Sequence, residues 1–390
     1  MVRFPTGLQN LTMEITSNFD SGNIDVVSID RKKNDIKLKI RRDTNSDFMQ
    51  WFHFRLTGAM KKSCAISIIN AGKTSYPKGW ENYNVCASYD REEWFRVRTT
   101  YKKGVLTFKF KPKFNSVYFA YFMPYSYERH LDLVHQAQMS QDVNVEIVGK
   151  TYEGRNIEML VIGKPKKEKK IIWMIARQHP GESMAEWFVE GFLERLLHPD
   201  DAVSKKILSA AVFYVVPNMN IDGSIAGNLR SNISGANLNR EWVKPTKKMS
   251  PEVYYVRKKI EETGIHLMLD IHGDEELPYN FIVAAEGIPD YSEYQARLEK
   301  EFVTHWMQTS PDFQDTHKYP LDKFGDANLT LCSNYIAQHF GCLALTIEMP
   351  FKDNADLPDK NVGWSDVRSR LLGASVLNPV LHVMKLLRKP

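Results

Sequence analysis

The stretch Lys170–Leu197, KIIWMIARQHPGESMAEWFVEGFLERLL, joins a predicted strand to a predicted helix and decides the fold. Residues 171–176 are an unbroken apolar run with the length and β-branching of a buried strand. After a polar interval, apolar residues return at helical spacing, namely Trp187, Phe188, Phe192, Leu193 and Leu196. His179 is therefore expected at the end of a strand, and Glu182 in the first turn of a helix. In an open α/β sheet this is the usual place for a ligand site.

His179 and Glu182 have the spacing His-x-x-Glu, which turns an imidazole and a carboxylate toward one point. These groups are two of the three protein ligands that a catalytic zinc takes, with the fourth position left for water. The motif also occurs by chance in chains of this size, so its meaning depends on what the rest of the chain supplies.

The length and composition indicate a globular protein. A chain of 390 residues suggests two domains or one large one. Apolar residues make up 43% and charged residues 25%, as is typical of a soluble protein. Lys and Arg exceed Asp and Glu by 52 − 47 = 5, which fits an acidic substrate without demanding one. No concentrated basic tail points to a nucleic-acid partner, so none is expected.

The cysteines and the apolar runs indicate a cytoplasmic protein. Four cysteines lie far apart with no C-x-x-C pair, which favours free thiols over disulfides or a thiolate zinc site: Cys64, Cys86, Cys332 and Cys342. Residues 1–17 lack the apolar core of a signal peptide. The longest apolar run, near 207–216, is too short to span a bilayer, so we expect no membrane association. The oligomeric state stays open.

The pattern of the chain changes near residue 125. Before it, short alternating runs such as 36–40, 52–56 and 106–110 are separated by turn residues, which indicates an antiparallel β-sandwich. This part contains no catalytic constellation, so we expect a packing or substrate-orienting module that takes no part in the chemistry. From residue 126, strands alternate with helices, which predicts a mixed, largely parallel sheet covered by helices. The predicted domains are residues 1–125 and 126–390.

His272 is a second candidate ligand at a strand end. It follows the apolar run that begins at Leu267 and lies 272 − 182 = 90 residues past Glu182. A His/Glu pair followed by a distant His is the ligand set expected of a hydrolytic zinc. Taken alone, His272 could equally be a structural histidine.

Three polar residues lie in an irregular segment rich in Asn and Gly, residues 217–242: Arg230, Asn239 and Arg240. Such a segment is commonly a solvated loop. Two arginines with an asparagine also suit recognition of a carboxylate and an oxyanion, because guanidinium offers a fixed donor fork. Glu348 ends a fourth apolar run, where burial would raise its proton affinity and suit it to acid–base catalysis. An ordinary strand-end carboxylate is the simpler interpretation.

The order of these motifs resembles the zinc metallocarboxypeptidases of the M14 family, and more closely their cytosolic carboxypeptidase subfamily. The motifs are HPGE (179–182), PNMNIDGS (217–224), GNLR (227–230), GANLNREW (235–242), DIHGD (270–274) and TIEMPF (346–351). In that subfamily a β-sandwich precedes the catalytic domain, and QWFHFR (50–55) and YFMPYSY (121–127) are similar to its typical features. The resemblance covers nearly the whole chain and implies a metallocarboxypeptidase-like fold.

The resemblance implies a role for each candidate residue. One Zn²⁺ per chain would be held by His179, Glu182 and His272. Arg230 would polarise the scissile carbonyl, Asn239 and Arg240 would hold the substrate's terminal carboxylate, and Glu348 would be the catalytic glutamate. Zinc lowers the pKa of its water, the glutamate moves the proton to the leaving amine, and the arginine shares the developing oxyanion.

The chain departs from the family pattern at one position and leaves a second feature unassigned. Asn237 stands where many relatives have an aspartate thought to support a zinc-ligating histidine; an amide can accept the same hydrogen bond but carries no charge. The family often places a mobile tyrosine over the substrate, and four tyrosines lie in the relevant interval without a motif to select one: Tyr279, Tyr294, Tyr319 and Tyr335.

Three functions are compatible with these residues. The leading one is a zinc-dependent carboxypeptidase that removes C-terminal residues from peptides or proteins. Acidic residues such as glutamate are candidate substrates, and any specificity-determining residue is expected within Lys318–Leu331. The alternative is a zinc amidase or deacylase acting on a small amino-acid conjugate or a cell-wall peptide. The third is a catalytically inactive binding module, which the intact motif set argues against.

Overall fold

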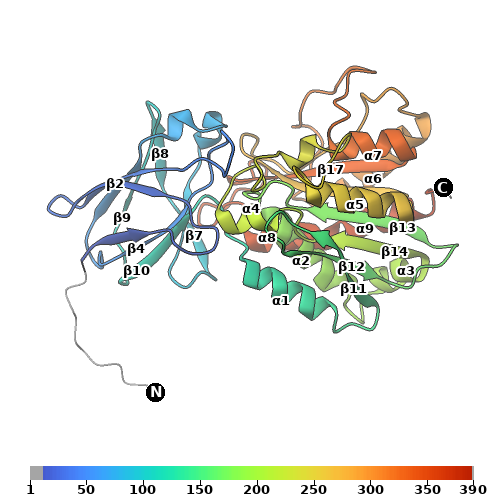
Figure 1. Ribbon diagram of the computed structural model, residues 1–390, viewed down its shortest axis with the longest axis horizontal. Helices are drawn as coiled ribbons and strands as arrows, with labels where there is room; N and C mark the ends of the chain where they lie inside the picture. The colour runs from blue at the N-terminus through green and yellow to red at the C-terminus, as the bar shows by residue number, and fades with distance from the viewer. Residues whose placement is uncertain (1–11, 389–390) are drawn as a thin grey trace.

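The computed structural model describes residues 12–388, so most of the stretch considered for a signal peptide lies outside the described residues. Two regions lie side by side along the longest axis (Figure 1). The first is rich in β-strands and is coloured blue to cyan. The second alternates strands and helices and is coloured green to red.

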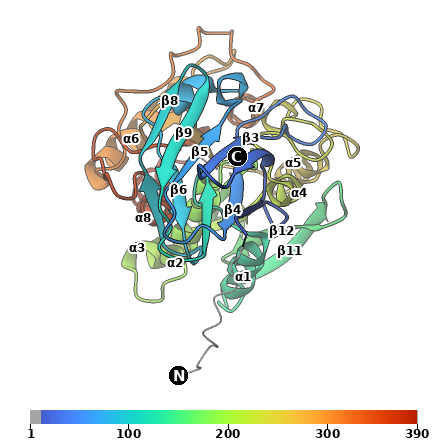
Figure 2. The ribbon, with the colours of Figure 1, turned by 90° about the vertical axis from the view of Figure 1, so that its left-hand side faces the viewer.

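The first region is a sandwich of two five-stranded sheets, with strand orders β1-β4-β10-β6-β7 and β2-β3-β5-β9-β8. Figure 2 looks onto this region, with β4 and β9 toward the viewer. The strands are β1 (Glu14–Thr16), β2 (Asp25–Asp30), β3 (Asp35–Lys39), β4 (His53–Thr57), β5 (Cys64–Ile68), β6 (Val85–Ser88), β7 (Trp94–Val97), β8 (Thr99–Lys102), β9 (Val105–Phe110) and β10 (Ser116–Ala120).

The predicted β-sandwich is confirmed, and its strands have the expected alternation. In β3, Ile36 and Leu38 are buried while the lysines beside them face solvent. The pairing differs from the prediction at one place, because β3 and β5 run parallel. The other named pairs in these two sheets are antiparallel.

The second region is built on a seven-stranded sheet of order β11-β12-β14-β13-β15-β17-β16. Its four central strands run parallel, and the pairs at both edges are antiparallel. The strands are β11 (Val143–Lys150), β12 (Asn156–Ile162), β13 (Lys170–Ala176), β14 (Ala211–Val216), β15 (Leu267–Asp274), β16 (Phe281–Val283) and β17 (Leu343–Pro350). This arrangement places the carboxyl ends of β13, β15 and β17 at one edge of the sheet.

Helices cover both faces of this sheet, as predicted. The helices are α1 (Tyr127–Ala137), α2 (Met184–Leu196), α3 (Ala202–Ala210), α4 (Ile221–Ala226), α5 (Pro251–Thr263), α6 (Glu293–Thr309), α7 (Cys332–Phe340), α8 (Asp366–Ser375) and α9 (Leu377–Met384). Alternate residues of β13 belong to two apolar clusters: Ile172 and Met174 join helices α2, α3, α6, α8 and α9, while Trp173 and Ile175 join α5 and α7. The first cluster continues into the β-sandwich, so the two regions share one core.

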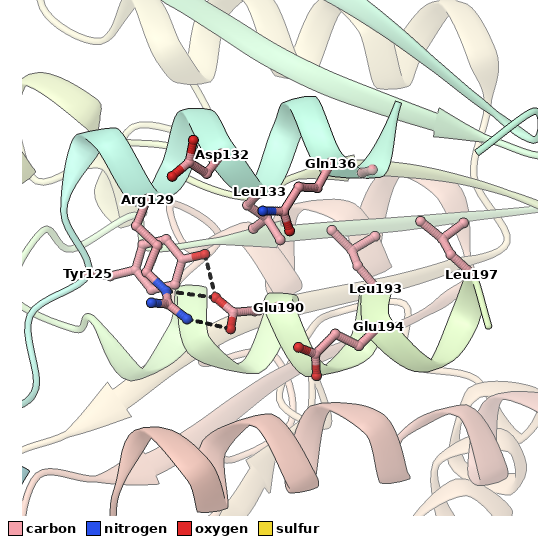
Figure 3. Close-up of a pocket in the computed structure, with 10 residues that line it drawn as sticks. Tyr125, Arg129, Asp132, Leu133, Gln136, Glu190, Leu193, Glu194 and Leu197 are labelled. Carbon is pink, nitrogen blue, oxygen red and sulfur yellow. Dashed lines mark hydrogen bonds and ion pairs between the residues drawn. The ribbon is translucent and has the colours of Figure 1, made fainter. Parts of the chain in front are cut away.

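Helix α1 links the two regions and packs beside α2. Between them lies a hollow whose wall carries a paired carboxylate, Glu190 (Figure 3). Glu190 accepts hydrogen bonds from the Tyr125 hydroxyl at 2.8 Å and from Arg129 Nε and Nη2 at 3.0 and 2.8 Å. These contacts fix the linking helix against the α/β region.

The C-terminal helical segment is interrupted at Val376, between α8 and α9, and Pro379 lies in the first turn of α9, where its missing N–H breaks no helical bond. Strands β15 and β17 continue past the predicted ends because they pair along their whole length, with His272 opposite Glu348. Both residues are therefore inside strands.

Candidate active site

The turn after β13 is held in an uncommon conformation. Arg177 has a φ of 57°, in the left-handed region that residues other than glycine seldom occupy. Its buried guanidinium donates to the Pro180 carbonyl at 2.9 Å, to the Tyr125 carbonyl at 2.9 Å and to Glu186 Oε2 at 2.7 Å. These bonds offset the strain and direct the following residues into the site. Glu182 lies two residues before the first residue of α2, slightly earlier than predicted.

Three buried side chains converge beyond this turn. Glu182 Oε1 lies 2.7 Å from His179 Nδ1, and Glu182 Oε2 lies 2.8 Å from His272 Nδ1. The two Nδ1 atoms are 3.2 Å apart. One potential ligand atom from each of the three residues lies within 4.8 Å of the others. Two imidazoles and a carboxylate in this arrangement can hold a divalent metal ion.

The outward-facing nitrogen of each histidine has its own partner. His179 Nε2 lies 3.0 Å from Asn237 Oδ1, so Asn237 occupies the supporting position considered from the sequence. His272 Nε2 lies 3.0 Å from Asp270 Oδ1, and Asp270 Oδ2 accepts from Gln178 Nε2 at 2.8 Å. One histidine is thus oriented by a neutral amide and the other by a carboxylate, which fixes both rings.

The protonation states of His179 and Glu182 suit metal binding, whereas that of His272 does not. Burial, reinforced by the charge of Arg230, lowers the pKa of His179 to about 4. Burial alone would raise the pKa of Glu182, but His179 and His272 outweigh it and hold that pKa below its ordinary value. Burial opposes the charged form of His272, yet Asp270 and Glu182 raise its pKa well above the ordinary value. A metal ion bound here would displace a proton from His272.

Glu348 lies beside this cluster with an unpaired oxygen. It is directly opposite His272 in the β15–β17 pairing, so both side chains project from the same face of the sheet. Its Oε2 is buried and has no hydrogen-bond partner among the described residues. Burial raises the pKa of Glu348 well above its ordinary value. A carboxyl group whose proton affinity is raised by burial is suited to acid–base catalysis.

The segment after β14 brings its three candidate residues to the same place. Asn239 and Arg240 lie in a short 3₁₀ turn, Leu238–Arg240, where Arg240 Nη1 donates to the Asn239 carbonyl at 2.7 Å. Asn239 Oδ1 accepts from the Cys332 N–H at 2.8 Å, which orients its amide. Asn239 is buried, Arg240 is exposed and Arg230 is half-buried. Partial desolvation, and then the charge of Arg230, lower the pKa of Arg240.

All seven candidate residues line one cavity of about 630 Å³. They are His179, Glu182, Arg230, Asn239, Arg240, His272 and Glu348. The wall residues that the sequence did not single out include Tyr76 and Glu275. Tyr76 belongs to the β-sandwich region, so this region supplies part of the cavity wall. That is compatible with the substrate-orienting module expected from the sequence, and the expectation that the region takes no part in the chemistry stays a prediction. No local motif marked Tyr76, because its contact with the site is made only in the folded chain.

Of the four tyrosines left open by the sequence, Tyr319 lines the cavity. Its hydroxyl donates to Asp274 Oδ2, and its ring meets Phe281 edge-on with centroids 5.0 Å apart. Tyr279 stacks on His317 instead. The segment predicted to determine specificity contributes five wall residues, namely Lys318, Tyr319, Pro320, Asp322 and Leu331.

Comparisons with known proteins match both regions. A family model described as the cytosolic carboxypeptidase N-terminal domain matches residues 15–122, and one described as zinc carboxypeptidase matches residues 127–362. A metallo-carboxypeptidase from Burkholderia cenocepacia has a similar structure, with a TM-score of 0.93, 49% identity, and coverage of 95% of this chain and 99% of that chain.

Two further proteins extend the comparison. A Pseudomonas aeruginosa metallo-carboxypeptidase in complex with (2-guanidinoethylmercapto)succinic acid has a TM-score of 0.93 and 44% identity over 96% of this chain and 100% of that chain. Human cytosolic carboxypeptidase 1 is 28% identical over 63% of this chain but only 24% of its own length. The chain thus spans about a quarter of that relative. Within residues 12–388, no helix is long and apolar enough to cross a membrane.

Proposed function

Because this chain belongs to the M14 family of zinc carboxypeptidases and is therefore a peptide hydrolase, we propose that it removes residues from the free carboxyl ends of peptides or proteins. One observation carries the proposal: three metal-binding side chains, an unpaired buried glutamate and two arginines line a single cavity. The proposed metal is one Zn²⁺ per chain, with His179, Glu182 and His272 as its ligands. Two imidazoles and one carboxylate leave a coordination position for water, as a catalytic zinc requires.

The remaining residues take roles that follow from their positions. When bound, zinc would supply a Lewis acid that makes a water molecule more acidic. Glu348 would take the proton that this water loses as its oxygen bonds to the scissile carbonyl carbon, and would pass it to the leaving amine, since Oε2 of Glu348 has no hydrogen-bond partner within residues 12–388. Arg230 donates to the oxygen of the scissile carbonyl as negative charge develops there.

The terminal carboxylate of the substrate is held by Asn239 and Arg240. Arg240 offers a planar fork of donors at the cavity wall, and Asn239 adds an amide fixed by its bond to the Cys332 N–H. The ligand of the Pseudomonas relative is a succinic acid derivative, and its carboxylates agree with a site of this kind. Tyr319 is the tyrosine that would cover the bound substrate, because it alone of the four candidates lines the cavity in the described chain.

We propose an acidic residue, such as glutamate, as the substrate's C-terminal residue. Lys318 supports this, since it lines the cavity from the segment predicted to determine specificity. Its Nζ lies 2.8 Å from Asp315 Oδ1, so an acidic substrate would have to share or replace that partner. Peptides ending in Glu, Ala and Lys test this preference directly. Lys318→Gln should lose the preference for Glu and retain activity on Ala.

The other two hypotheses have less support. The amidase or deacylase alternative is not favoured, because the matched families are carboxypeptidases. An inactive binding module is not supported either, since every candidate residue lines the cavity. We further propose a cytoplasmic location, based on relatives named cytosolic carboxypeptidases, and a domain boundary between residues 125 and 126.

The decisive experiment compares one peptide with a free and an amidated C-terminus. The zinc-loaded protein should release the terminal residue of the free acid and leave the amide nearly intact, because only the free acid offers a carboxylate to Arg240. Mass spectrometry of the products measures both rates. Equal cleavage of the two peptides would refute the carboxypeptidase proposal and favour the amidase alternative.

A further inference from the structure

The loop that carries Arg230 is attached to the β-sandwich region. Asn23 Nδ2 donates to the Gly227 carbonyl at 2.8 Å, near the start of the loop. Asn45 Nδ2 donates to the Ile233 carbonyl at 2.9 Å, near its end. The loop is therefore held on both sides of Arg230 by residues about two hundred positions earlier in the chain.

Asp43 makes the central contact. Its Oδ1 accepts from the Leu229 N–H at 2.6 Å, and its Oδ2 accepts from the Arg230 N–H at 2.7 Å. Oδ2 also accepts from the N–H and the hydroxyl of Ser231, both at 2.9 Å. The Asp43 side chain is buried, with an exposed fraction of 4%. Three successive backbone N–H groups on one carboxylate form strong bonds that fix the backbone of Arg230.

Two glycines allow the loop to lie directly against this region. Gly227 has a φ of 73° and Gly235 a φ of 92°, both in the left-handed region that favours glycine. A Cβ on Gly227 would lie 2.8 Å from the Ser21 carbonyl oxygen, and one on Gly235 would lie 2.2 Å from the Asn45 carbonyl oxygen. The close approach therefore depends on the absence of side chains at both positions.

The guanidinium of Arg230 is held by the same region. It lies 5.7 Å from the centre of the Phe48 ring and 5.5 Å from that of Tyr76, within the range of cation–π attraction. Tyr76 is itself fixed, because its N–H donates to Gln50 Oε1 at 2.8 Å and its carbonyl accepts from Gln50 Nε2 at 3.1 Å. Both the backbone and the charged end of Arg230 thus depend on the β-sandwich.

We propose that Asp43 is a positioning residue for catalysis, which places Arg230 against the scissile carbonyl, so that the β-sandwich completes the active site. The inference rests on the proposed function, because it takes from it the role of Arg230. Donors aimed at a developing oxyanion act through their fixed placement, and a displacement of about 1 Å can cost about 10²-fold in rate. Asp43 provides that fixed placement without touching the substrate.

The first test is Asp43→Asn in the zinc-loaded protein. The asparagine keeps the shape, but its NH₂ group cannot accept from the backbone N–H groups, so the loop loses part of its anchor. We expect kcat to fall about 10- to 100-fold with little change in KM and a full zinc content. The matched control is Asp47→Asn, because Asp47 is exposed on the same segment and, within residues 12–388, forms an ion pair with Arg42 alone. The control should keep wild-type kinetics.

A double-mutant cycle separates positioning from general loss of structure. If Asp43 acts through Arg230, Asp43→Asn should reduce kcat/KM no more than about threefold in an Arg230→Ala background, because the effects of substituting two coupled residues do not add. An equal loss in both backgrounds would overturn the proposal. If Asp43→Asn does not fold, Asp43→Glu keeps the charge and shifts it by one methylene. That variant should still lose about tenfold in kcat, and full activity would likewise overturn the proposal.

A measurement without turnover keeps this proposal distinct from the proposed function. Hydrogen exchange of residues 228–232 should be at least tenfold faster in Asp43→Asn than in wild type, and unchanged in Asp47→Asn. Unchanged exchange in Asp43→Asn would overturn the positioning role whatever the activity. Failure of the wild type to cleave any free-acid peptide would instead overturn the proposed function.

Discussion

The metal-binding cluster and Arg230 line the same cavity, but different parts of the molecule hold them. His179 and Glu182 follow β13 and His272 lies within β15, and their hydrogen-bond partners among the described residues lie in the α/β region. Arg230 is held by Asp43, Phe48 and Tyr76 of the β-sandwich. The comparison indicates that the direct partners of the proposed metal ligands belong to one region, whereas the placement of Arg230 depends on both regions.

The metal-binding cluster and Arg230 also differ in how their charges are compensated. The carboxylate of Glu182 contacts both histidines and is fully buried. Arg230 is half-buried and, within residues 12–388, takes part in no ion pair. Aromatic rings attract a cation but leave its N–H groups free. Arg230 can therefore donate to a substrate oxygen without first breaking a salt bridge.

The largest effect on activity is expected when one of the proposed metal ligands is removed. His272→Ala removes one of three proposed ligands, so the protein should purify with little zinc and show no turnover. Arg230→Ala should keep a full equivalent of zinc, because Arg230 is not a proposed zinc ligand and is held by the β-sandwich. Elemental analysis of both variants measures the difference.

His339→Ala is a matched control for the histidine substitution, because His339 is exposed and lies outside the cavity. It should bind zinc like the wild type. A full equivalent of zinc in His272→Ala would show that the proposed ligand set is wrong.

Glu348→Gln should have the next largest effect. Glutamine keeps the shape of the side chain but cannot take a proton, and general acid–base catalysis contributes about 10²–10⁴-fold. We expect a loss of kcat in that range, with zinc content and melting temperature preserved. Activity within a factor of a few of wild type would remove Glu348 from the mechanism.

Arg240→Ala tests the part of the cavity that is proposed to bind the substrate's terminal carboxylate. Removing one partner of a desolvated charge pair costs about 2–5 kcal/mol, which corresponds to a loss of about 30- to several-thousand-fold in kcat/KM. Zinc should stay bound, since Arg240 contacts none of the three proposed ligands. The ratio of rates on free-acid and amidated peptides should fall toward one. A variant that keeps the wild-type ratio would assign carboxylate recognition to another residue.

The architecture of both regions could be predicted because each has a local signal in the sequence. In the α/β region the apolar run before His179 forms β13, and in the first region alternation and turn residues indicated the β-sandwich. All seven candidate residues line the cavity, because parallel strands bring their carboxyl ends to one edge. Their chemical roles remain predictions until the variants are measured.

The features that could not be predicted from the sequence depend on contacts or backbone conformations that local patterns do not encode. Asp43 and Tyr76 meet Arg230 across a separation of more than a hundred residues, and no periodicity or spacing encodes such a contact. The sequence named Tyr319 but could not select it among four tyrosines, because it lies in an irregular segment where pattern does not fix which way a side chain points. The turn at Arg177 also carried no signal, because a left-handed arginine is stable only through its buried partners.

The smallest effect on activity is expected at the helix that joins the two regions. His130 of α1 is buried, with Nδ1 2.6 Å from Glu186 Oε1 and Nε2 3.6 Å from Glu158 Oε2. Burial opposes its charged form, but Glu186 and Glu158 outweigh it and raise the pKa of His130 to about 9. In the unfolded chain the pKa of histidine is about 6.5.

A raised pKa means that protonation stabilises the folded state. The contribution of His130 is therefore complete below about pH 6.5 and is lost as the pH rises through about 9, at no more than about 1.4 kcal/mol per pH unit. His130→Gln should lack this term, so the gap in the free energy of unfolding between wild type and variant should shrink over that interval. Denaturant titrations at several pH values measure the gap. A gap that stays constant from pH 6.5 to 9 would refute the assignment, while kcat at neutral pH should remain near that of the wild type because the proposed zinc ligands keep their own partners.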